Sequence, residues 1–354
     1  MMKAVILSGG KGTRLRPITH TNAKQLVPVA NKPILFYGIE EIVRAGIRDV
    51  GIVIGDTGNE IKKAVGDGKK WGIKVTYIQQ ESPLGLAHAV KICKEFTKRD
   101  SFVVFLGDNL IRGGIKDLVD DFRKKKPNAQ VLLAHVPHPE QFGVVELKGN
   151  EVCRLVEKPA KPKSDLALVG VYMFDDNVYK AISNIKPSAR GELEITDAIQ
   201  WLVDNKYKVT PYIIKGWWKD TGKIEDMLEA NRIILDDIKS ANKGKVDGKS
   251  EIKGKVIIES GARVIDSVIR GPVIIGENAV IKHSYIGPFT SIASGVVIES
   301  SEVEHSIILA GCRIIEIKRI EDSLMGQNVH ILKSKSKPTA YRIMVGDSSR
   351  IEVL

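Results

Sequence analysis

The sequence predicts an α/β domain with a mainly parallel sheet, followed by a parallel β-helix. Over residues 3–235, short β-branched runs alternate with amphipathic stretches, which is the pattern of parallel strands joined by crossover helices. A polar, glycine-containing stretch follows at 236–250 and is typical of a linker. Beyond it, aliphatic residues recur with a period of 17, as expected for the stacked coils of a solenoid.

The first domain is expected to alternate seven strands with six helices. The expected strands are Lys3–Leu7, Asp49–Ile54, Lys74–Ile78, Phe102–Leu106, Ala129–Val136, Gly143–Leu147 and Val169–Phe174. The expected helices are Ile34–Ala45, Asn59–Val65, Leu86–Phe96, Ile115–Lys125, Asp176–Ile182 and Ile195–Asp204. Three strands run directly into glycine or an acid, at residues 7–10, 54–56 and 106–108. Ligands of such sheets lie outside the carboxyl ends of the strands, so we expect the functional site at that edge.

The 17-residue period of the second domain divides into steps of 6, 6 and 5 residues, which give three columns of stacked side chains. The columns are Ile252, Ile269, Ile286, Val303 and Ile320; Ile258, Ile275, Ile292, Leu309 and Gly326; and Val264, Ile281, Ile298, Ile315 and Leu332. Every position except Gly326 is aliphatic, and neither a helix nor a hairpin sheet requires such spacing. We therefore predict a β-helix with three faces per coil, and a C-terminal tail that caps it or binds a partner.

These patterns set the expected domain boundaries. We expect a first domain over 1–238, a linker over 239–250, and the β-helix with its tail over 251–354. No apolar run approaches the ~20 residues of a membrane span. Glycines interrupt the first apolar run after four residues, unlike a signal peptide, so we expect a cytoplasmic protein.

The net charge of +11 admits two interpretations. One is nucleic-acid binding. The lysines are spread along the chain without interleaved aromatic residues, which favours the other, a solvated surface that attracts anionic small molecules. The three cysteines are far apart in the sequence, so neither a disulfide framework nor a zinc site is expected.

The loop after the first strand, Ser8-Gly9-Gly10-Lys11-Gly12-Thr13-Arg14, is almost free of large side chains. Its glycines allow backbone N–H groups to approach an anion closely. Neither the GxGxxG dinucleotide fingerprint nor the GxxxxGK[ST] phosphate loop is present. Arg14 and Lys24 add two cations, and a guanidinium matches phosphate oxygens well. The sequence predicts a phosphate-binding loop of a different design.

At this point the chain resembles the sugar-1-phosphate nucleotidyltransferases, and most of all the glucose-1-phosphate thymidylyltransferases. The segments that carry the resemblance are GGKGTRLRP, KQLVPVANKPIL, AGIRDVGIVIG, GDGKKWGIKVTYIQQESPLGLAHAV, FLGDN, FGVVE, VEKP, GVYMF, RGELEITD and WWKDTG. They run from residue 3 to about 235. The resemblance implies a Rossmann-like nucleotidyltransferase core, and the added solenoid is similar to the left-handed β-helix of the long form of this family.

The resemblance also implies the reaction and the residues that carry it. A sugar 1-phosphate oxygen would attack the α-phosphorus of dTTP, or of UTP, and pyrophosphate would leave. The nucleophile is already ionised near neutral pH, so catalysis is mainly positioning and electrostatics. Arg14, Lys24 and Lys158 would be catalytic, and Asp108 and Asp220 would share Mg²⁺, which favours few protein carboxylates. Asp108 alone could instead be a helix N-cap.

The remaining implied contacts fall into two sets. The nucleotide-binding set would be Leu7, Gly9, Gly10, Gln25, Gln80, Gly85 and Asp108. The set that binds the sugar phosphate would be Leu86, Leu106, Gly143, Glu157, Lys158, Leu168 and Trp218. Core packing is an equal alternative for each of the three leucines in the second set. Gln25 and Gln80 would recognise the base, because an amide can both donate to and accept from a pyrimidine edge.

Departures from the short-enzyme pattern leave alternatives open. Phe142 stands where a tyrosine is usual, Leu84 where an acid is usual, and His88 where a glutamine is usual. UDP-glucose or UDP-N-acetylglucosamine synthesis is therefore an alternative within the same reaction class. An acyltransferase activity of the β-helix, using His283 or His305, is a second alternative, and a non-catalytic regulatory subunit is a third. The β-helix also suggests a homo-oligomer.

Overall fold

The computed structural model describes residues 2–10, 12–20, 23–214, 216–335 and 341–352. The chain forms two compact units. The first, here called the sheet unit, comprises Met1–Lys11, Ala23–Leu26 and Ile34–Asp220. The second, here called the coil unit, comprises Gly12–Asn22, Val27–Pro33 and Thr221–Leu354. Two short segments near the N-terminus are therefore part of the same unit as the β-helix.

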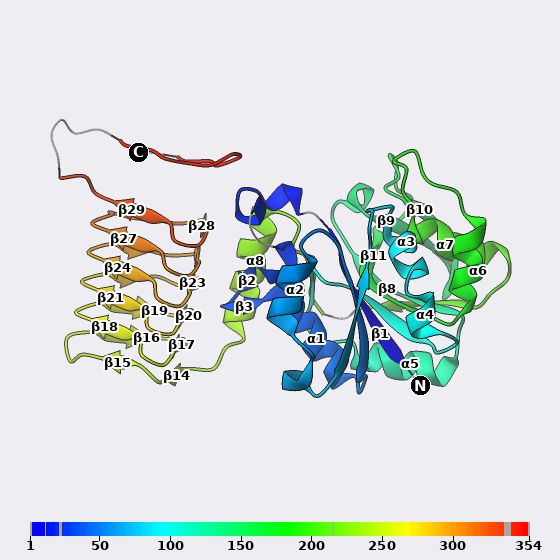
Figure 1. The fold of residues 1–354 in the computed structure, drawn as a ribbon, viewed down its shortest axis with the longest axis horizontal. Helices are drawn as coiled ribbons and strands as arrows, with labels where there is room; N and C mark the ends of the chain where they lie inside the picture. Colours follow the sequence, from blue (N-terminus) through cyan, green and yellow to red (C-terminus); the bar gives the residue numbers. More distant parts are fainter. Residues whose placement is uncertain (1, 11, 21–22, 215, 336–340, 353–354) are drawn as a thin grey trace. The chain divides into compact units, whose positions relative to one another are not determined.

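The sheet unit is built around a nine-stranded sheet. Strands β5, β4, β1 and β6 are parallel neighbours in that order, and β11 joins β6 antiparallel and continues the sheet toward β8, β9, β10 and β12 (Figure 1). A separate two-stranded ribbon pairs β7 with β13. The bounds are β1 Lys3–Ser8, β4 Asp49–Ile54, β5 Lys74–Gln79, β6 Phe102–Leu106, β7 Asn109–Ile111, β8 Ala129–His135, β9 Gly143–Lys148, β10 Glu151–Glu157, β11 Leu166–Phe174, β12 Val209–Ile213 and β13 Trp218–Asp220.

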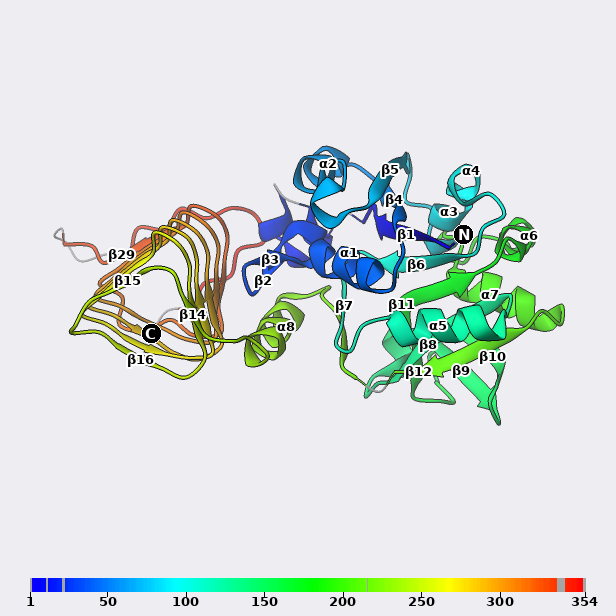
Figure 2. The ribbon, with the colours of Figure 1, turned by 90° about the horizontal axis from the view of Figure 1, so that it is seen from below.

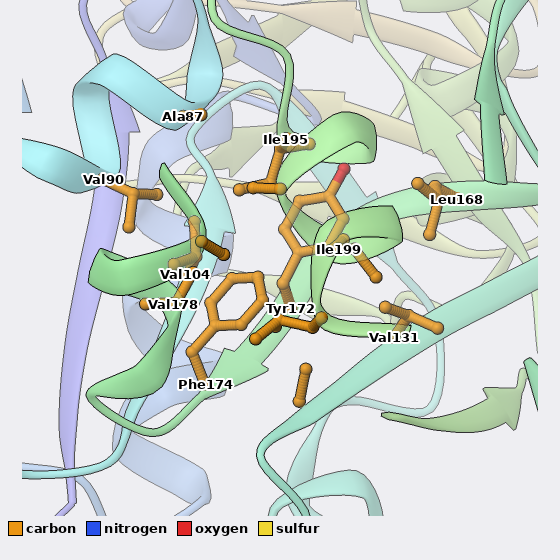
Figure 3. Close-up of a cluster of buried hydrophobic side chains, with 14 of the residues drawn as sticks. Ala87, Val90, Val104, Val131, Leu168, Tyr172, Phe174, Val178, Ile195 and Ile199 are labelled. Atoms are coloured by element: carbon orange, nitrogen blue, oxygen red, sulfur yellow. The ribbon is translucent and has the colours of Figure 1, made fainter. Parts of the chain in front are cut away.

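Helices cover both faces of this sheet because successive side chains of each strand point to opposite faces. Ala4 and Ile6 of β1 pack with α1, α2 and α5, whereas Val5 and Leu7 pack with α3, α6 and α7. Figure 3 shows the second core, where Ile195 and Ile199 of α7 meet Tyr172 and Phe174 of β11. The bounds are α1 Ile34–Arg44, α2 Gly58–Val65, α3 Leu86–Lys91, α4 Lys94–Thr97, α5 Lys116–Lys125, α6 Asn177–Asn184 and α7 Ile195–Asp204.

The predicted elements of this unit are confirmed with small shifts in their ends, and with one division. The helix expected over Leu86–Phe96 consists of α3 and α4 separated at Ile92–Cys93. Strands β7, β10, β12 and β13 were not predicted. Strands β7 and β13 are only three residues long, and the apolar residues of β10, EVCRLVE, do not alternate regularly with its charged ones. Strand β12 contains Pro211 and, among the described residues, pairs only with β8, as expected of an edge strand, the place where proline is tolerated.

The coil unit is a left-handed parallel β-helix preceded by α8 Ile224–Asp236. Its faces are three parallel sheets, which Figures 1 and 2 show as stacked coils. The strands are β14 Ala241–Asn242, β15 Lys245–Val246, β16 Glu251–Lys253, β17 Val256–Ile258, β18 Arg263–Ile265, β19 Val268–Arg270, β20 Val273–Ile275, β21 Val280–Lys282, β22 Tyr285–Ile286, β23 Thr290–Ile292, β24 Val297–Glu299, β25 Glu302–Val303, β26 Ile307–Ile308, β27 Arg313–Ile315, β28 Leu324–Met325 and β29 His330–Leu332.

The column of Ile252 is confirmed through all its members, to the bridge between Val303 and Ile320. The other two columns are correct for three coils and then wrong by one residue. Ile292 pairs with Ile308 rather than Leu309, and Ile308 pairs with Met325 rather than Gly326. In the same way Ile298 pairs with Ile314, not Ile315, and Ile314 with Ile331, not Leu332. The corner after Val303 is one residue shorter than in the coils before it, and the period of 17 therefore breaks there.

Residues 239–250, expected as a linker, contribute to the first coil instead. Ala241 and Asn242 pair with Ile257 and Ile258 in β17, and β15 pairs with β18. The glycine-rich composition of this stretch reflects the corners of a coil. Of the predicted tail, residues 336–340 and 353–354 lie outside the described residues, as does Lys11 of the phosphate loop.

Within the coil unit, α8 and the segment 27–33 are joined to the β-helix by a buried polar network. Oδ1 of Asn231 accepts hydrogen bonds from the Ala30 backbone at 2.9 Å and from Ser291 Oγ at 2.5 Å. Nδ2 of Asn231 donates to the Phe289 carbonyl at 3.0 Å. Ala30, Leu235 and Ile274 add a small apolar cluster beside it. Segment 27–33 contains the short hairpin of β2 Pro28–Val29 and β3 Lys32–Pro33.

Candidate functional site

The carboxyl ends of β1 and β6 lie side by side, since Leu7 pairs with Leu106 in the parallel register. The Gly107 backbone donates to the Leu7 carbonyl at 3.0 Å. The loop Ser8-Gly9-Gly10 and the segment Gly107-Asp108 are therefore neighbours, as the strand-end pattern predicts. On the other side of β1, Ser8 pairs with Ile54 of β4, so all three predicted strand ends meet at one edge of the sheet.

The two glycines of the loop have no room for a side chain. A Cβ built on Gly9 would lie 2.8 Å from Oε1 of Gln80, and one built on Gly10 would lie 3.1 Å from Cε of Lys24. Gln80 follows β5, and Lys24 is in the short 3₁₀ helix Lys24–Leu26. Glycine at 9 and 10 thus lets the Gln80 amide and the Lys24 ammonium group approach the loop backbone closely.

Lys24 and Asp108 form an ion pair through Nζ and Oδ2. Their side chains are 15% and 13% exposed, so solvent screens the pair only weakly. Burial acts to raise the pKa of Asp108, but the Lys24 ammonium and the hydrogen bonds of the carboxylate prevail and hold that pKa below its usual value. One of those bonds is donated by Nδ2 of Asn109 at 3.0 Å. The neighbours of the carboxylate thus favour its ionised form.

The second predicted acid, Asp220, lies next to the first. It ends β13, and its backbone pairs with Asn109, the residue that follows Asp108. Trp218 of the same strand donates from Nε1 to Oδ1 of Asn109 at 2.6 Å, and the Gly170 backbone donates to the same oxygen at 3.3 Å. The ribbon of β7 and β13 therefore places Asp220 opposite the residue that follows Asp108. Among the described residues, no group of three or more His, Cys, Asp and Glu side chains could hold a metal ion.

The predicted sugar-binding residues gather around Gly143 at the start of β9. A Cβ on Gly143 would lie 3.1 Å from Leu168 Cδ1 and 3.2 Å from Glu157 Oε2. Thr196 Oγ1 donates to Glu157 Oε2 at 3.2 Å, and Arg190 donates to Oε1 at 3.2 Å. Burial and the nearby Glu194 raise the pKa of Glu157. Glu157 is thus a half-buried hydrogen-bond acceptor beside a small backbone recess.

Lys158 and the predicted leucines differ in surroundings. Lys158 is exposed and follows β10 with a positive φ of 41°, so its side chain can reach a ligand in solvent. Leu106 and Leu168 pack against buried residues of the sheet unit. Leu86 begins α3 directly after Gly85, whose φ of 99° and close approach to the Leu193 carbonyl (2.5 Å from a built Cβ) require glycine.

Arg14 belongs to the coil unit. Its guanidinium lies 2.8 Å from the position of a Cβ on Gly222, the glycine of the WWKDTG segment. The same loop is braced by Thr19, whose Oγ1 donates to the Gly12 carbonyl at 2.6 Å. A side chain at 222 would displace the guanidinium, so the loop that carries Arg14 and this glycine are mutually adapted.

Four polar residues of the site were not singled out as site residues from the sequence. Ser8 is fully buried, and its Oγ has no hydrogen-bond partner among the described residues. The same holds for Oε1 of Gln25, which is 1% exposed. Gln25 was predicted, but Ser8, Asn109, Thr196 and His88 were not. Their signal in the sequence is only proximity to a strand end or to a predicted residue.

His283 and His305, considered for acyl transfer, lie at corners of the β-helix with positive φ. Each ring pairs through Nδ1 with an aspartate of a neighbouring coil, His283 with Asp266 at 2.9 Å and His305 with Asp322. This arrangement braces adjacent coils, and a structural role explains both histidines.

The chain is similar to several known proteins. Residues 3–237 match the family model described as "Nucleotidyl transferase". A glucose-1-phosphate thymidylyltransferase of Streptomyces antibioticus is 53% identical over 354 residues, 99% of both chains. One of Streptomyces griseus is 56% identical over 267 residues, 75% of both chains. A crystal structure from Bacillus anthracis, described as a glucose-1-phosphate thymidylyltransferase in complex with sucrose, is 36% identical, has a TM-score of 0.64, and covers 68% of this chain and 98% of that one.

Proposed function

This chain belongs to the nucleotidyl transferase family, and from that premise we propose that it transfers a thymidylyl group from dTTP to α-D-glucose 1-phosphate. UTP is expected to be a second nucleotide substrate. The observation that carries the proposal is the buried Lys24–Asp108 pair beside Gly9 and Gly10, with Asp220 on the adjoining strand. The similarity to glucose-1-phosphate thymidylyltransferases over the full chain supports this choice of substrates.

In the reaction, an oxygen of the sugar phosphate forms a bond to the α-phosphorus of the triphosphate. The bond from that phosphorus to the bridging oxygen of the β-phosphate breaks, and pyrophosphate leaves with the electron pair. The sugar phosphate is ionised near neutral pH, so no side chain needs to remove a proton. The barrier comes from bringing two polyanions into line, and positive groups and backbone N–H donors lower it.

The residues of this chain divide that task. The backbone of Gly9 and Gly10 is proposed to hold the triphosphate, with Lys24 neutralising charge at the phosphates. Arg14 is proposed to bind triphosphate oxygens, and the exposed Lys158 the phosphate of the sugar. Glu157 would accept hydrogen bonds from sugar hydroxyls beside Gly143, with Leu86, Leu106, Leu168 and Trp218 as apolar walls. Gln25 and Gln80 would recognise the base, and Leu7 and Gly85 would complete the set that binds the nucleotide.

Asp108 and Asp220 fit a magnesium ion, because carboxylate oxygens are its preferred protein ligands and one or two of them suffice. When bound, Mg²⁺ would neutralise charge on the phosphate oxygens. In the structure Asp108 pairs with Lys24, and both side chains would lie at the phosphates, Asp108 as a metal ligand and Lys24 as a neutralising charge. The low pKa of Asp108 keeps it ionised for this role.

The proposal also covers the cellular location and the oligomeric state of the protein. Within the described ranges, no helix combines the length and apolar character needed to cross a bilayer. We propose a cytoplasmic enzyme whose β-helix contributes to a homo-oligomer. Both partners of the reaction would then be diffusible small molecules.

A substrate matrix tests this function. Pyrophosphate release is measured with dTTP, UTP, CTP and GTP, each combined with glucose 1-phosphate and N-acetylglucosamine 1-phosphate, in the presence of Mg²⁺. The proposal predicts the highest kcat/KM for dTTP with glucose 1-phosphate. A preference for UTP with N-acetylglucosamine 1-phosphate would contradict it and favour UDP-N-acetylglucosamine synthesis.

A further inference from the structure

We propose that the β-helix positions Arg14 for triphosphate binding, with Ile18 and Gly326 as the positioning residues. Ile18 lies on the segment that carries Arg14, and Gly326 directly follows strand β28 in the last coil of the β-helix. The inference rests on the proposed function, because it assigns triphosphate oxygens to Arg14. It adds that the β-helix contributes to nucleotide binding as well as to assembly.

Two short 3₁₀ helices make up the segment that carries Arg14, Thr13–Leu15 and Ile18–His20. In the second helix, Thr19 Oγ1 donates to the Gly12 carbonyl at 2.6 Å. The same carbonyl accepts a hydrogen bond from the last backbone N–H of the first helix at 3.0 Å. Because both helices bind one carbonyl group, a shift of the second helix would move the first, and with it Arg14.

Gly326, the one position in the predicted columns that is not aliphatic, lies against the second of these helices. A Cβ built on Gly326 would lie 3.4 Å from Ile18 Cδ1. Gly326 is not among the residues with positive φ, so its backbone conformation does not require glycine. Its carbonyl accepts a hydrogen bond from Cys312 Sγ at 2.9 Å. The missing side chain therefore leaves room for Ile18, and this contact joins the segment of Arg14 to the β-helix.

The guanidinium of Arg14 is also supported from the coil unit. Its Nη2 lies 2.8 Å from the position of a Cβ on Gly222, shortly before α8 begins. Helix α8 is joined to the β-helix by the fully buried Asn231, which bonds Ser291 Oγ at 2.5 Å and the Phe289 carbonyl at 3.0 Å. The backbone and the charged end of Arg14 are thus both connected to the β-helix.

The consequence concerns one of the two substrates. Arg14 is exposed, and its guanidinium matches phosphate oxygens well. A long side chain loses rotamer freedom when it binds a ligand, and preorganisation reduces that cost. A shift of the segment should therefore weaken triphosphate binding. The residues proposed to bind glucose 1-phosphate, among them Glu157 and Lys158, lie on other elements and should be unaffected.

The test compares variants on both sides of the contact in the full-length protein. Ile18→Ala removes the contact, and Gly326→Leu fills the space that Ile18 occupies. Each should raise the Kd for dTTP, measured by calorimetry with Mg²⁺, and the KM for dTTP about tenfold, the equivalent of one charge-assisted hydrogen bond. The KM for glucose 1-phosphate should stay unchanged. Gly326→Ala should have a smaller effect, because a Cβ at 3.4 Å is in ordinary contact.

Gly248→Leu is the matched control. Gly248 belongs to the same unit, has no positive φ, and has no described atom within 4 Å of a built Cβ. The double variant Ile18→Ala with Gly326→Leu should bind dTTP more tightly than Gly326→Leu alone, because the smaller side chain makes room for the larger one. A general loss of folding would not be relieved in this way.

In an Arg14→Ala background, Ile18→Ala should leave the Kd for dTTP unchanged, because Ile18 acts through Arg14. Unchanged Kd values in both single variants of a protein that turns over dTTP would overturn this inference alone. An equal rise in KM for both substrates would also overturn it. If the wild-type protein bound no dTTP, the proposed function and this inference would both fail.

Discussion

Buried serine hydroxyls in the coil unit have hydrogen-bond partners, whereas two buried polar atoms in the sheet unit have none among the described residues. In the β-helix, the Ser284 backbone donates to Ser267 Oγ at 3.0 Å, and Ser284 Oγ donates to the Lys282 carbonyl at 2.7 Å. Ser301 repeats the pattern one coil later. In contrast, neither Ser8 Oγ at the end of β1 nor Gln25 Oε1 in the 3₁₀ helix Lys24–Leu26 has a hydrogen-bond partner among the described residues.

This difference distinguishes polar groups that stabilise the fold from polar groups that could bind a ligand. Buried polar groups normally find partners, because an unpaired one costs free energy. Satisfied serines at a repeating position stabilise neighbouring coils, whereas unsatisfied atoms beside a glycine loop indicate a place for a ligand or water. The other unpartnered atoms among the described residues belong to Asp49, Gln130 and Thr210. All three are at the beginnings of strands, away from the edge where β1 and β6 end.

The largest effect should come from Asp108→Asn at the strand end. The variant keeps the side-chain volume but removes the charge that pairs with Lys24 and binds the cation. We expect kcat for pyrophosphate release to fall at least about 100-fold, with the far-UV circular dichroism spectrum retained. Asp120→Asn is the matched control, because the ion pairs that Asp120 forms with Lys116 and Arg123 are exposed. If Asp108→Asn turned over like the control, the metal assignment would be wrong.

Asn231→Leu, in the coil unit, should lower the stability of the protein. The change leaves the Ala30 backbone N–H, the Phe289 carbonyl and the Ser291 hydroxyl without their partner, at a cost of about 3 kcal/mol in the free energy of unfolding. Thermal unfolding followed by circular dichroism should show a Tm lower by about 6–12 °C.

Asn184→Ala provides a control for that variant, because its side chain only bonds the Lys180 carbonyl at the exposed end of α6. Its effect should stay within about 0.5 kcal/mol. An equal loss of stability in both asparagine variants would show that the Asn231 network has no special weight.

Two serine variants should change the free energy of unfolding by smaller amounts, and the sign of the change should differ between them. Ser284→Ala removes a hydroxyl that both donates and accepts, and should lower the free energy of unfolding by about 1 kcal/mol. Ser8→Ala removes a hydroxyl with no partner, and should leave that free energy unchanged or slightly higher. Urea titrations of both variants provide the comparison. A loss at Ser8 as large as that at Ser284 would mean that Ser8 is already satisfied, and the distinction between the two regions would fail.

The sequence predicts most of both regions, and the failures have physical causes. A column of stacked aliphatic residues is visible because each coil repeats the same environment, but the shorter corner after Val303 moves the inward positions to Ile308 and Ile314 without changing the composition. Strand β12 escaped prediction because Pro211 argues against a strand unless the strand is known to be at an edge.

The candidate site, too, could be predicted only in part from the sequence. Glycines 9 and 10, Lys24, Asp108 and Asp220 could be proposed because a loop, a charge or a family motif marks them. Asn109 and His88 make hydrogen bonds with Trp218 and Gln80, and such contacts between separate elements are not visible in the sequence. Gln25 could be named, but the sequence gives no sign that its oxygen is buried without a partner.

The most direct test of the central claim is a crystal structure of the protein with Mn²⁺ and dTDP-glucose, with anomalous diffraction measured at the manganese edge. We predict a manganese peak ligated by both Asp108 and Asp220 and by a phosphate oxygen of the nucleotide sugar. A peak that touches only one of the two carboxylates, or a nucleotide sugar bound away from Gly9 and Gly10, would contradict the account.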